Sequence, residues 1–414
     1  MVEPHDRSPP SRAVLILLLL AFAELLGMSL WFSANAVSDE FRSLWSLSAG
    51  QAGWLTTVVQ LGFVAGTATA AVLNLADVIP ARHYFAASAA LGAIVNAALV
   101  VAPGYAAALA LRFATGFFLA GVYPPGMKMA ATWFRKGRGL AIGTVVGALT
   151  VGKAAPYLMK AWVPGGIAFV VLSVSAGAVL AALLILVGYR DGPYPFARRQ
   201  FSWQLVGTVV RHREWRLATG GYLGHMWELY AFWTWIPVFL AASVAAGAQD
   251  VNVSALSVAA FAVIAAGGVG CLWGGWLADR IGYDRLVIRA LLASGACSLL
   301  AGIVFGGGLW GLLALASLWG FFVVADSAQF SAMITEVVPQ HAVGTALTLQ
   351  TSFGFLLTML TIQLVPAIAD AGSWRWAFVL LALGPAAGIW SIRRLQLAGR
   401  TWRRAGGTAG RETA

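Results

Sequence analysis

Several ionisable side chains lie within stretches of this sequence that otherwise carry almost no charge. The set comprises Glu24, Arg112, Lys128, Lys153, His225, Glu228 and Asp326. A charged side chain at the centre of a membrane-spanning helix costs at least about 2.5–3.5 kcal/mol, so each one needs a partner or a ligand. Carboxylates and a histidine can exchange protons, whereas a lysine or an arginine can hold an anion. These residue types predict proton handling together with binding of an anionic molecule.

His225 and Glu228 belong to the segment GHMWELYAFWTW, residues 224–235. Their spacing of three places both side chains on one helical face, where they can interact. The aromatic residues around them are Trp227, Tyr230 and Trp233. A protonatable pair beside aromatic rings predicts a site that binds an organic substrate, and Gln329, three residues after Asp326, is expected to complete its polar lining. A hydrogen bond that fixes this helix to its neighbour is the structural alternative.

Lys153 is the strongest single indication of an anionic substrate. An ammonium group at its depth must pair with an acid, lose its proton or meet an anion. We expect Lys153 to contact the substrate together with Arg112, and a fixed salt bridge to Glu24 or Glu228 is the alternative. The candidates for proton coupling are Glu24, Glu228 and Asp326.

The composition indicates the elements that must position these residues. Of the 414 residues, 60% are hydrophobic and only 10% are charged. A soluble protein of this size cannot bury so much apolar surface, and a hydrocarbon core about 30 Å thick needs about 20 apolar residues per helix. The predicted spans are residues 13–35, 51–74, 83–103, 105–131, 139–160, 165–188, 216–243, 253–276, 287–306, 309–333, 342–366 and 374–392. They lack the alternation of barrel strands, which predicts an all-α membrane protein with twelve transmembrane helices.

The basic residues predict the orientation of the chain in the membrane. With a cytoplasmic N-terminus, 21 of the 27 lysines and arginines fall in the inner loops, in the two tails or in the first three residues of a span at its inner end. The outer loops then contain only Arg42, Lys160 and Arg375. We therefore expect both termini in the cytoplasm. The net charge of +11 is then a topology signal and does not indicate nucleic-acid binding.

The sequence contains an internal repeat. The tripeptide LAD occurs at residues 75–77 and again at 277–279, 202 positions later, each time after the second span of a six-span half. This offset predicts a duplicated six-helix unit. The most hydrophilic interruption lies between the halves and is followed by an amphipathic segment. The predicted organisation is an N-terminal six-helix bundle at 1–190, a cytoplasmic linker with an interfacial helix at 191–214, and a C-terminal six-helix bundle with a basic tail at 215–414.

The second repeat carries the pattern Gly275-x-x-x-Asp279-Arg280-x-Gly282-x-Asp284-Arg285. This pattern resembles the inner-loop signature of the major facilitator superfamily, and the resemblance extends over essentially the whole chain. It implies a secondary transporter built from two six-helix bundles related by pseudo-two-fold symmetry. In that family the aspartate of the signature meets the N-terminus of a neighbouring helix and closes the inner gate. The gating residues implied by the resemblance are Gly275, Asp279, Arg280, Gly282 and Arg285, with Asp77 in a degraded first copy.

A second resemblance concerns the fourth span, where Arg112-Phe-Ala-Thr-Gly116 is followed by Pro124. It is similar to a family motif whose buried arginine is associated with proton coupling. The fifth span has glycines at 139, 143, 147 and 152 but lacks the Gly-Pro pair of the drug antiporters. The region most resembles bacterial members near the nitrate/nitrite, cyanate and organic-anion porters.

The leading hypothesis is a secondary transporter that moves a small organic anion by alternating access and is coupled to protons. Proton-coupled efflux of drugs or other amphipathic compounds is the second hypothesis, and a non-transporting membrane sensor or scaffold is a distant third. We expect no enzymatic activity and no metal, because the spans contain no paired metal ligands and no serine–histidine arrangement at midplane depth. We also expect no nucleotide cofactor, since GALTVGKA at 147–154 lacks the final Ser or Thr of a phosphate-binding loop. The expected partners are an anionic small molecule, protons and membrane lipid, with the protein a monomer in a bacterial inner membrane.

Overall fold

The computed structural model describes residues 10–134, 138–163, 166–194, 203–339 and 341–409, and all the regular secondary structure in these ranges is helical. Twelve segments are long and apolar enough to cross a membrane, from Arg12–Ala36 to Trp374–Ala398. This number and the all-helical class confirm the prediction from composition. The long apolar runs form helices because a helix satisfies all its backbone hydrogen bonds internally, as a lipid environment requires.

Seven spans are unbroken helices. They are α4 (Ala49–Val72), α9 (Arg138–Trp162), α10 (Ile167–Gly188), α12 (Arg213–Ala246), α13 (Val253–Ile281), α14 (Tyr283–Val304) and α17 (Val343–Ala371). Three short helices lie between spans, namely α3 (Ser38–Trp45), α5 (Leu75–Val78) and α11 (Trp203–Arg211).

The other five spans contain a break or a short 3-10 segment. Span 1 comprises α1 (Pro10–Met28), η1 (Ser29–Phe32) and α2 (Ser33–Ala36), and span 3 comprises α6 (Ala81–Ala97) and η2 (Ala98–Val101). Span 4 comprises α7 (Tyr105–Leu119) and α8 (Tyr123–Ala131), and span 10 comprises α15 (Leu309–Ala325) and α16 (Ser327–Val337). Span 12 comprises α18 (Trp374–Ala377), η3 (Val379–Ala382) and α19 (Leu383–Ala409). These breaks expose backbone groups inside the bundle, where side chains can bind them.

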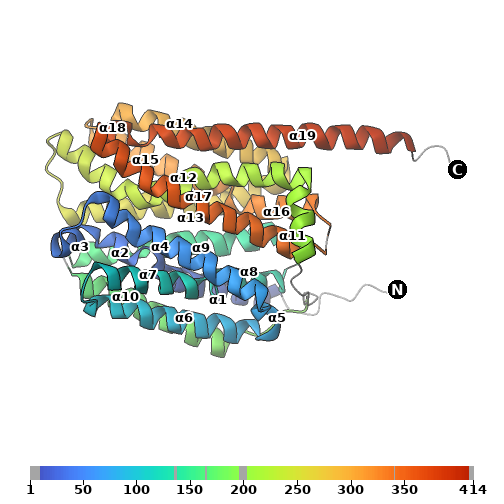
Figure 1. Ribbon diagram of the computed structural model, residues 1–414, viewed down its shortest axis with the longest axis horizontal. Helices are drawn as coiled ribbons and strands as arrows, with labels where there is room; N and C mark the ends of the chain where they lie inside the picture. Colours follow the sequence, from blue (N-terminus) through green and yellow to red (C-terminus); the bar gives the residue numbers. More distant parts are fainter. Residues whose placement is uncertain (1–9, 135–137, 164–165, 195–202, 340, 410–414) are drawn as a thin grey trace.

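The helices gather in two halves. Figure 1 shows α1 to α10 in the lower half and α12 to α19 in the upper half, with α1 beginning and α19 ending at the same end of the molecule. The halves meet where α9 lies against α13 and where α4 lies against α17. We call the end at which α1 begins and α19 ends the terminal end, and the other the opposite end.

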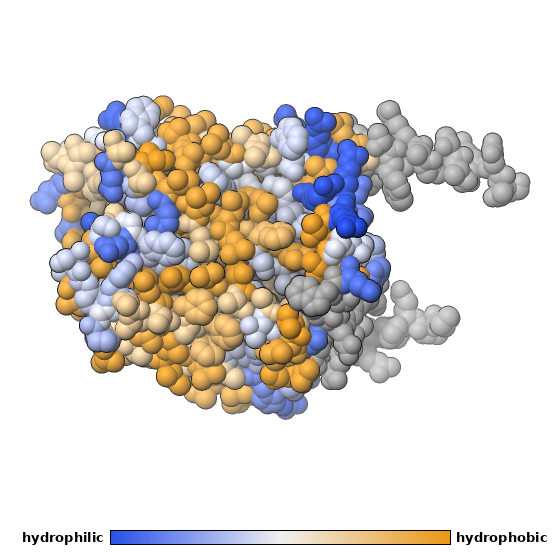
Figure 2. Space-filling model, viewed as in Figure 1, coloured by the Kyte–Doolittle hydropathy of each residue, from blue (hydrophilic) through white to orange (hydrophobic). Residues whose placement is uncertain are grey.

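The surface of the molecule is consistent with a membrane environment. Figure 2 shows a broad apolar region across the middle, with hydrophilic residues gathered toward the two ends. Large apolar side chains are exposed on this surface, including Val187 at 86%, Trp310 at 82% and Ile303 at 76%. A lipid environment covers such side chains, and the chain is thus a multi-pass membrane protein.

Candidate functional site

Lys153 lies at the interface between the two halves and is surrounded by aromatic rings. Its ammonium group lies 4.5 Å from the ring centroid of Trp31 and 4.6 Å from those of Tyr230 and Trp233. It also donates a hydrogen bond of 2.5 Å to the Tyr230 hydroxyl. Each ring is close enough for a cation–π interaction, which attracts the ammonium to the negative face of the ring. We call Trp31, Tyr230 and Trp233 the aromatic cage.

The aromatic cage joins residues from distant parts of the chain. Trp31 belongs to the 3-10 segment of span 1, whereas Tyr230 and Trp233 lie three residues apart on α12. Phe355 of α17 packs against both Trp31 and Tyr230, with ring centroids 5.5 and 5.2 Å apart. Lys153 projects from α9 and therefore bridges the first half to the second.

The cage also presents unused hydrogen-bond donors. The indole nitrogens of Trp31 and Trp233 are buried and have no hydrogen-bond partner among the described residues. No carboxylate of the described residues lies within 4.0 Å of the Lys153 ammonium, which is itself buried at 3% exposure. Buried polar groups are normally paired, so a positive charge beside unpaired N–H groups is suited to an anion that supplies the acceptors.

A cavity of about 40 Å³ lies beside the cage. Its lining combines one charged group with hydroxyls and apolar side chains, contributed by Tyr123, Val146, Leu149, Thr150, Lys153, Tyr222, Met226, Leu229, Tyr230, Trp233, Val324, Ser327, Ser331, Thr351 and Phe355. Tyr222 lies two turns nearer the terminal end of α12 than Tyr230, so the cavity extends from the cage toward the terminal end. Such a mixed lining has the chemistry of a small-molecule site, but this volume holds only about three water molecules, so a substrate needs the halves to move apart.

The interface is closed between the cage and the opposite end. The Gln363 side chain of α17 donates a 2.9 Å hydrogen bond to the Thr57 hydroxyl of α4. Trp235 of α12 packs against Gly53 of α4, where an added β-carbon would lie 3.0 Å from the indole ring. Because only glycine leaves this space, Gly53 allows the two halves to meet here.

Glu24 is fully buried on α1, and neither of its carboxylate oxygens has a hydrogen-bond partner among the described residues. The carboxylate lies against Gly126 of α8, where an added β-carbon would collide with Oε1. It interacts electrostatically with Lys153, although the two groups form no ion pair within 4.0 Å. An unpaired acid next to a buried cation is chemically able to exchange a proton.

His225 pairs with Asp326. The distance between His225 Nδ1 and Asp326 Oδ1 is 2.9 Å, and both side chains are 1% exposed. Asp326 is the residue between α15 and α16, so the pair connects α12 to the break in span 10. His225 Nε2 has no hydrogen-bond partner in the described part of the chain, and the same holds for the nearby Gln329 side-chain nitrogen. The structure thus brings His225 together with Asp326 and not with Glu228.

Glu228 and Trp227 lie away from the cavity lining. The Glu228 carboxylate accepts hydrogen bonds from Ser294 of α14, at 2.8 Å, and from the Trp319 indole of α15, at 2.7 Å. The Trp227 indole donates to the carbonyl of Leu380 in span 12. Both side chains thereby connect α12 to other helices of the second half.

Arg112 is fully buried on α7 and binds backbone carbonyls instead of a carboxylate. Its guanidinium donates to the carbonyls of Leu55, Leu30 and Trp31, and to the side chains of Ser33 and Asn96. Leu30 and Trp31 belong to the 3-10 segment of span 1, whose carbonyls are not all used within the helix. The five donors of a guanidinium match this set of acceptors, so Arg112 stabilises the break that places Trp31 in the cage.

The signature of the second repeat lies at the terminal end of the α9–α13 contact. A β-carbon added to Gly139, in the first turn of α9, would lie 3.2 Å from the Asp279 carboxylate, and one added to Gly275 would lie 3.3 Å from the Gly139 carbonyl. The carboxylate thus faces a helix N-terminus, where it is stabilised by the helix dipole. Gly282 has a φ of 92°, a value that favours glycine, between α13 and α14.

The other signature residues have different surroundings. The Arg280 guanidinium lies 3.6 Å from the ring centroid of Trp276, and Arg285 is exposed. The side chain of Asp77 lies outside the described residues.

Sequence reasoning missed four aromatic residues of the candidate site, Trp31, Tyr123, Tyr222 and Phe355. Trp31 lies seven residues after Glu24, which is the spacing of one helical face, so a signal for it existed. Phe355 and Tyr123 are indistinguishable from ordinary apolar helix residues in the sequence. Their place at the site depends on how distant helices pack together.

A two-part helical bundle with a polar cavity at the interface of its halves defines a membrane transporter of small molecules. The sequence model of the Major Facilitator Superfamily matches residues 16–270 and 221–407, and the chain belongs to this family. The prediction of a transporter rather than an enzyme is thereby confirmed. A D-galactonate transporter of Escherichia coli O6:H1 is 29% identical over 119 residues, which cover 29% of this chain and 27% of that protein.

Solved structures have the same fold. A bacterial homologue of the human lysosomal transporter Spinster, inward-facing and occupied, has a TM-score of 0.68 at 17% identity, with 95% of this chain and 98% of that chain covered. FucP in an outward conformation has a TM-score of 0.67 at 16% identity, with 93% and 99% covered. A variant of the Escherichia coli fucose:proton symporter FucP has a TM-score of 0.64 at 16% identity, with 92% and 99% covered.

Proposed function

We propose that this protein is a secondary transporter that moves a small organic anion and couples its movement to protons. The observation that carries the proposal is Lys153, a buried ammonium at the interface of the halves with no carboxylate of the described residues within ion-pair distance. A buried charge of this kind needs a partner of opposite sign, and an anionic substrate supplies one. Partial similarity to a D-galactonate transporter also supports an organic acid as the substrate.

The aromatic cage gives the substrate site its geometry. We assign the anionic group of the substrate to the Lys153 ammonium, with the Trp31 and Trp233 indoles as further donors. Charge-assisted hydrogen bonds of this type are the stronger ones in proteins, and they strengthen further where water is excluded. The body of the substrate extends toward the hydroxyl-lined part of the cavity near Ser331 and Thr351.

We assign proton coupling to Glu24, with the His225–Asp326 pair as a second group. Glu24 is the buried acid that interacts electrostatically with Lys153, so its protonation changes the charge balance at the substrate site. His225 and Asp326 connect the break in span 10 to α12, which lines the cavity. A proton on either group thus alters a contact between helices that line the site.

Alternating exposure follows from the contacts between the halves. The interface is held at the opposite end by Gln363 and Thr57, and at the terminal end by Asp279 against the first turn of α9. Rocking of the halves about the cage would break one set of contacts while it keeps the other. We place the protein in a bacterial inner membrane, in the branch of the family near the nitrate/nitrite, cyanate and organic-anion porters.

Efflux of amphipathic compounds is the alternative function, and the aromatic lining favours it. The cage already surrounds an ammonium group, so a cationic drug would meet a like charge there. An anionic or neutral amphipathic compound would avoid this repulsion. The substrate screen below separates the two functions.

The test is a thermal-shift screen of purified protein with sugar acids, aliphatic and aromatic carboxylates, organophosphates and cationic amphipathic drugs, followed by counterflow in proteoliposomes. We expect an anion to stabilise the protein and to be exchanged, and Lys153→Ala to abolish both effects. The matched control is Lys160→Ala, which removes a lysine of the same helix that pairs with Glu40 outside the cavity. Stabilisation that persists in Lys153→Ala, or stabilisation by cationic drugs alone, would refute the assignment.

A further inference from the structure

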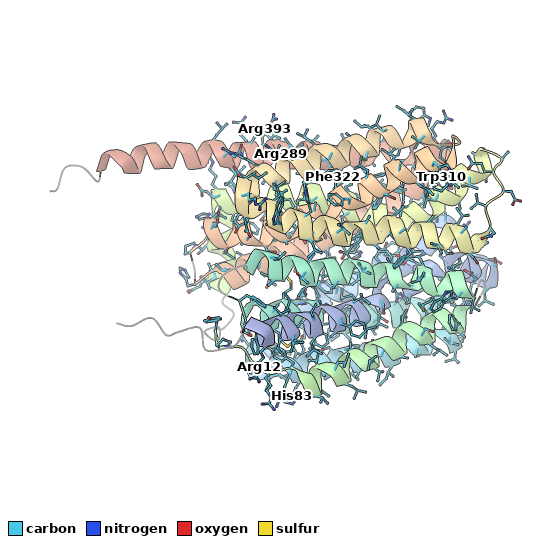
Figure 3. The ribbon with its side chains drawn as sticks, turned by 180° about the vertical axis from the view of Figure 1, so that it is seen from behind. Arg12, His83, Arg289, Trp310, Phe322 and Arg393 are labelled. Atoms are coloured by element: carbon cyan, nitrogen blue, oxygen red, sulfur yellow. The ribbon has the colours of Figure 1, made fainter. Side chains whose placement is uncertain are left out.

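Three arginines form a cluster on the exposed flank of the second half, near the terminal end (Figure 3). Arg285 and Arg289 are one turn apart on α14 and therefore share a helical face, and Arg393 belongs to the neighbouring helix α19. All three side chains are exposed. Figure 3 shows Arg289 and Arg393 close together toward the terminal end of these two helices. We call these residues the arginine cluster.

The register between α14 and α19 places the three residues at one level. The Gln396 amide donates a 2.6 Å hydrogen bond to Asp284, and Pro385 packs against Gly295. The two helices are thus antiparallel, and Arg393, three residues before Gln396, lies level with residue 287. This height is between those of Arg285 and Arg289, about 3 Å from each along the helix axis.

The cluster has no acidic partner in the part of the chain that the structure describes. Within the described residues, none of the three guanidinium groups takes part in a hydrogen bond or an ion pair. The acid next in sequence, Asp284, is engaged by Gln396 at the contact between the helices. Three like charges at one level repel one another unless an anion binds between them.

The same face of α14 becomes apolar one turn deeper. Leu292 is 52% exposed, Leu299 is 53% exposed and Ile303 is 76% exposed along this stripe. A lipid-facing stripe of this kind contacts acyl chains, so the arginine cluster lies where the stripe enters the headgroup region.

We propose that the arginine cluster binds the phosphate of an anionic phospholipid in the leaflet at the terminal end. Guanidinium groups bind phosphate oxygens in a two-pronged geometry, and the apolar stripe beginning at Leu292 accommodates the acyl chains. An inorganic phosphate would use only the charged part of this surface, whereas a phospholipid uses both parts. The basic residues predict that this leaflet is the cytoplasmic one, which carries anionic lipids.

The test compares the full-length protein with Arg289→Gln/Arg393→Gln in detergent, titrated with phosphatidylglycerol. The melting temperature and native mass spectrometry report binding. We expect the double variant to bind about 30-fold more weakly, since each arginine near an anionic lipid contributes about a factor of five. The matched control is Arg82→Gln/Arg216→Gln, which removes two exposed arginines on separate helices and is expected to bind like the unaltered chain.

Three results would overturn the proposal. One is equal binding of phosphatidylglycerol by the double variant and the unaltered protein. Another is an equal shift with phosphatidylcholine, which would show that the net charge of the lipid is not recognised. The third is a shift of the same size with inorganic phosphate alone, which would assign the cluster to a soluble anion. Because the arginine cluster lies outside the cavity, none of these results bears on the substrate assigned to Lys153.

Discussion

Lys153 differs from the other buried charges because aromatic rings surround its ammonium group. Three ring centroids lie within 4.6 Å of the ammonium, and the nearby acid, Glu24, forms no hydrogen bond with any described residue. Glu228, in contrast, accepts two hydrogen bonds within the second half. Two buried glutamates of similar depth are therefore expected to have different roles.

Glu24→Gln tests the role of an acid that can change its charge. The amide has almost the same size but cannot release a proton, so we expect substrate exchange to continue while accumulation driven by a pH gradient is lost. Counterflow and pH-driven uptake in the same proteoliposomes measure the two properties separately. Unimpaired accumulation would contradict a coupling role for Glu24.

Glu228→Gln serves as the comparison for that experiment. Its amide nitrogen would face one of two donors, Ser294 or Trp319, so we expect a lower melting temperature as the main effect. A stable Glu228→Gln protein that lost only pH-driven accumulation would move the coupling role to Glu228.

At the scale of the elements, breaks in spans 1, 4 and 10 create the site. The 3-10 segment of span 1 turns Trp31 into the cage, and Asp326 lies at the break of span 10, where His225 binds it. The 3-10 segment of span 1 has carbonyls that are not all used within the helix, and Arg112 donates to two of them. The sequence motif around Arg112 therefore has a clear structural use within the first half.

Arg112→Ala is expected to destabilise the protein by about 2–4 kcal/mol. The estimate assumes that each interhelical hydrogen bond in a membrane contributes on average about 0.6 kcal/mol and at most about 1.7 kcal/mol. Thermal unfolding in detergent measures the loss. Arg112→Lys keeps the charge but not the forked donors, so it should recover only part of the stability. An unchanged melting temperature for Arg112→Ala would show that the break in span 1 holds without it.

At the scale of the whole molecule, glycines determine how closely the halves approach. A β-carbon on Gly147 of α9 would lie 2.8 Å from the Gly268 carbonyl of α13, whereas Gly152 packs within the first half against Leu25. Gly143, a turn from Gly147, faces the carbonyl of Cys271. The glycine repeat of α9 thus serves both the interface between the halves and the packing within one half.

The orientation of the molecule gives a prediction at the same scale. Because most of the lysines and arginines that the structure describes lie toward the terminal end (Figure 1), we expect both termini to face the cytoplasm. A fluorescent protein fused to the C-terminus should be bright, and alkaline phosphatase fused there should be inactive. The same two reporters inserted at residue 248, between α12 and α13, should give the reverse result. The same reporter result at the C-terminus and at residue 248 would contradict the predicted topology.

Features that depend only on a short stretch of the sequence could be predicted. The twelve spans follow from the length of each apolar run, and the repeat follows from two copies of one tripeptide. Lys153, Tyr230 and Trp233 could be selected because a charge or an aromatic cluster within an apolar run is visible without any partner. The spacing of His225 and Glu228 correctly indicates a shared helix but not the neighbour that each one meets.

What the sequence by itself determined is the number of helices, their division into halves and the presence of buried charges, since burial in lipid depends on local composition. The tertiary structure alone decided which buried groups meet. It pairs His225 with Asp326, ties Glu228 to α14 and α15, and brings Trp31 to Lys153 across the interface. The physical reason is that helical spacing specifies a face, whereas the packing of distant helices specifies what that face contacts.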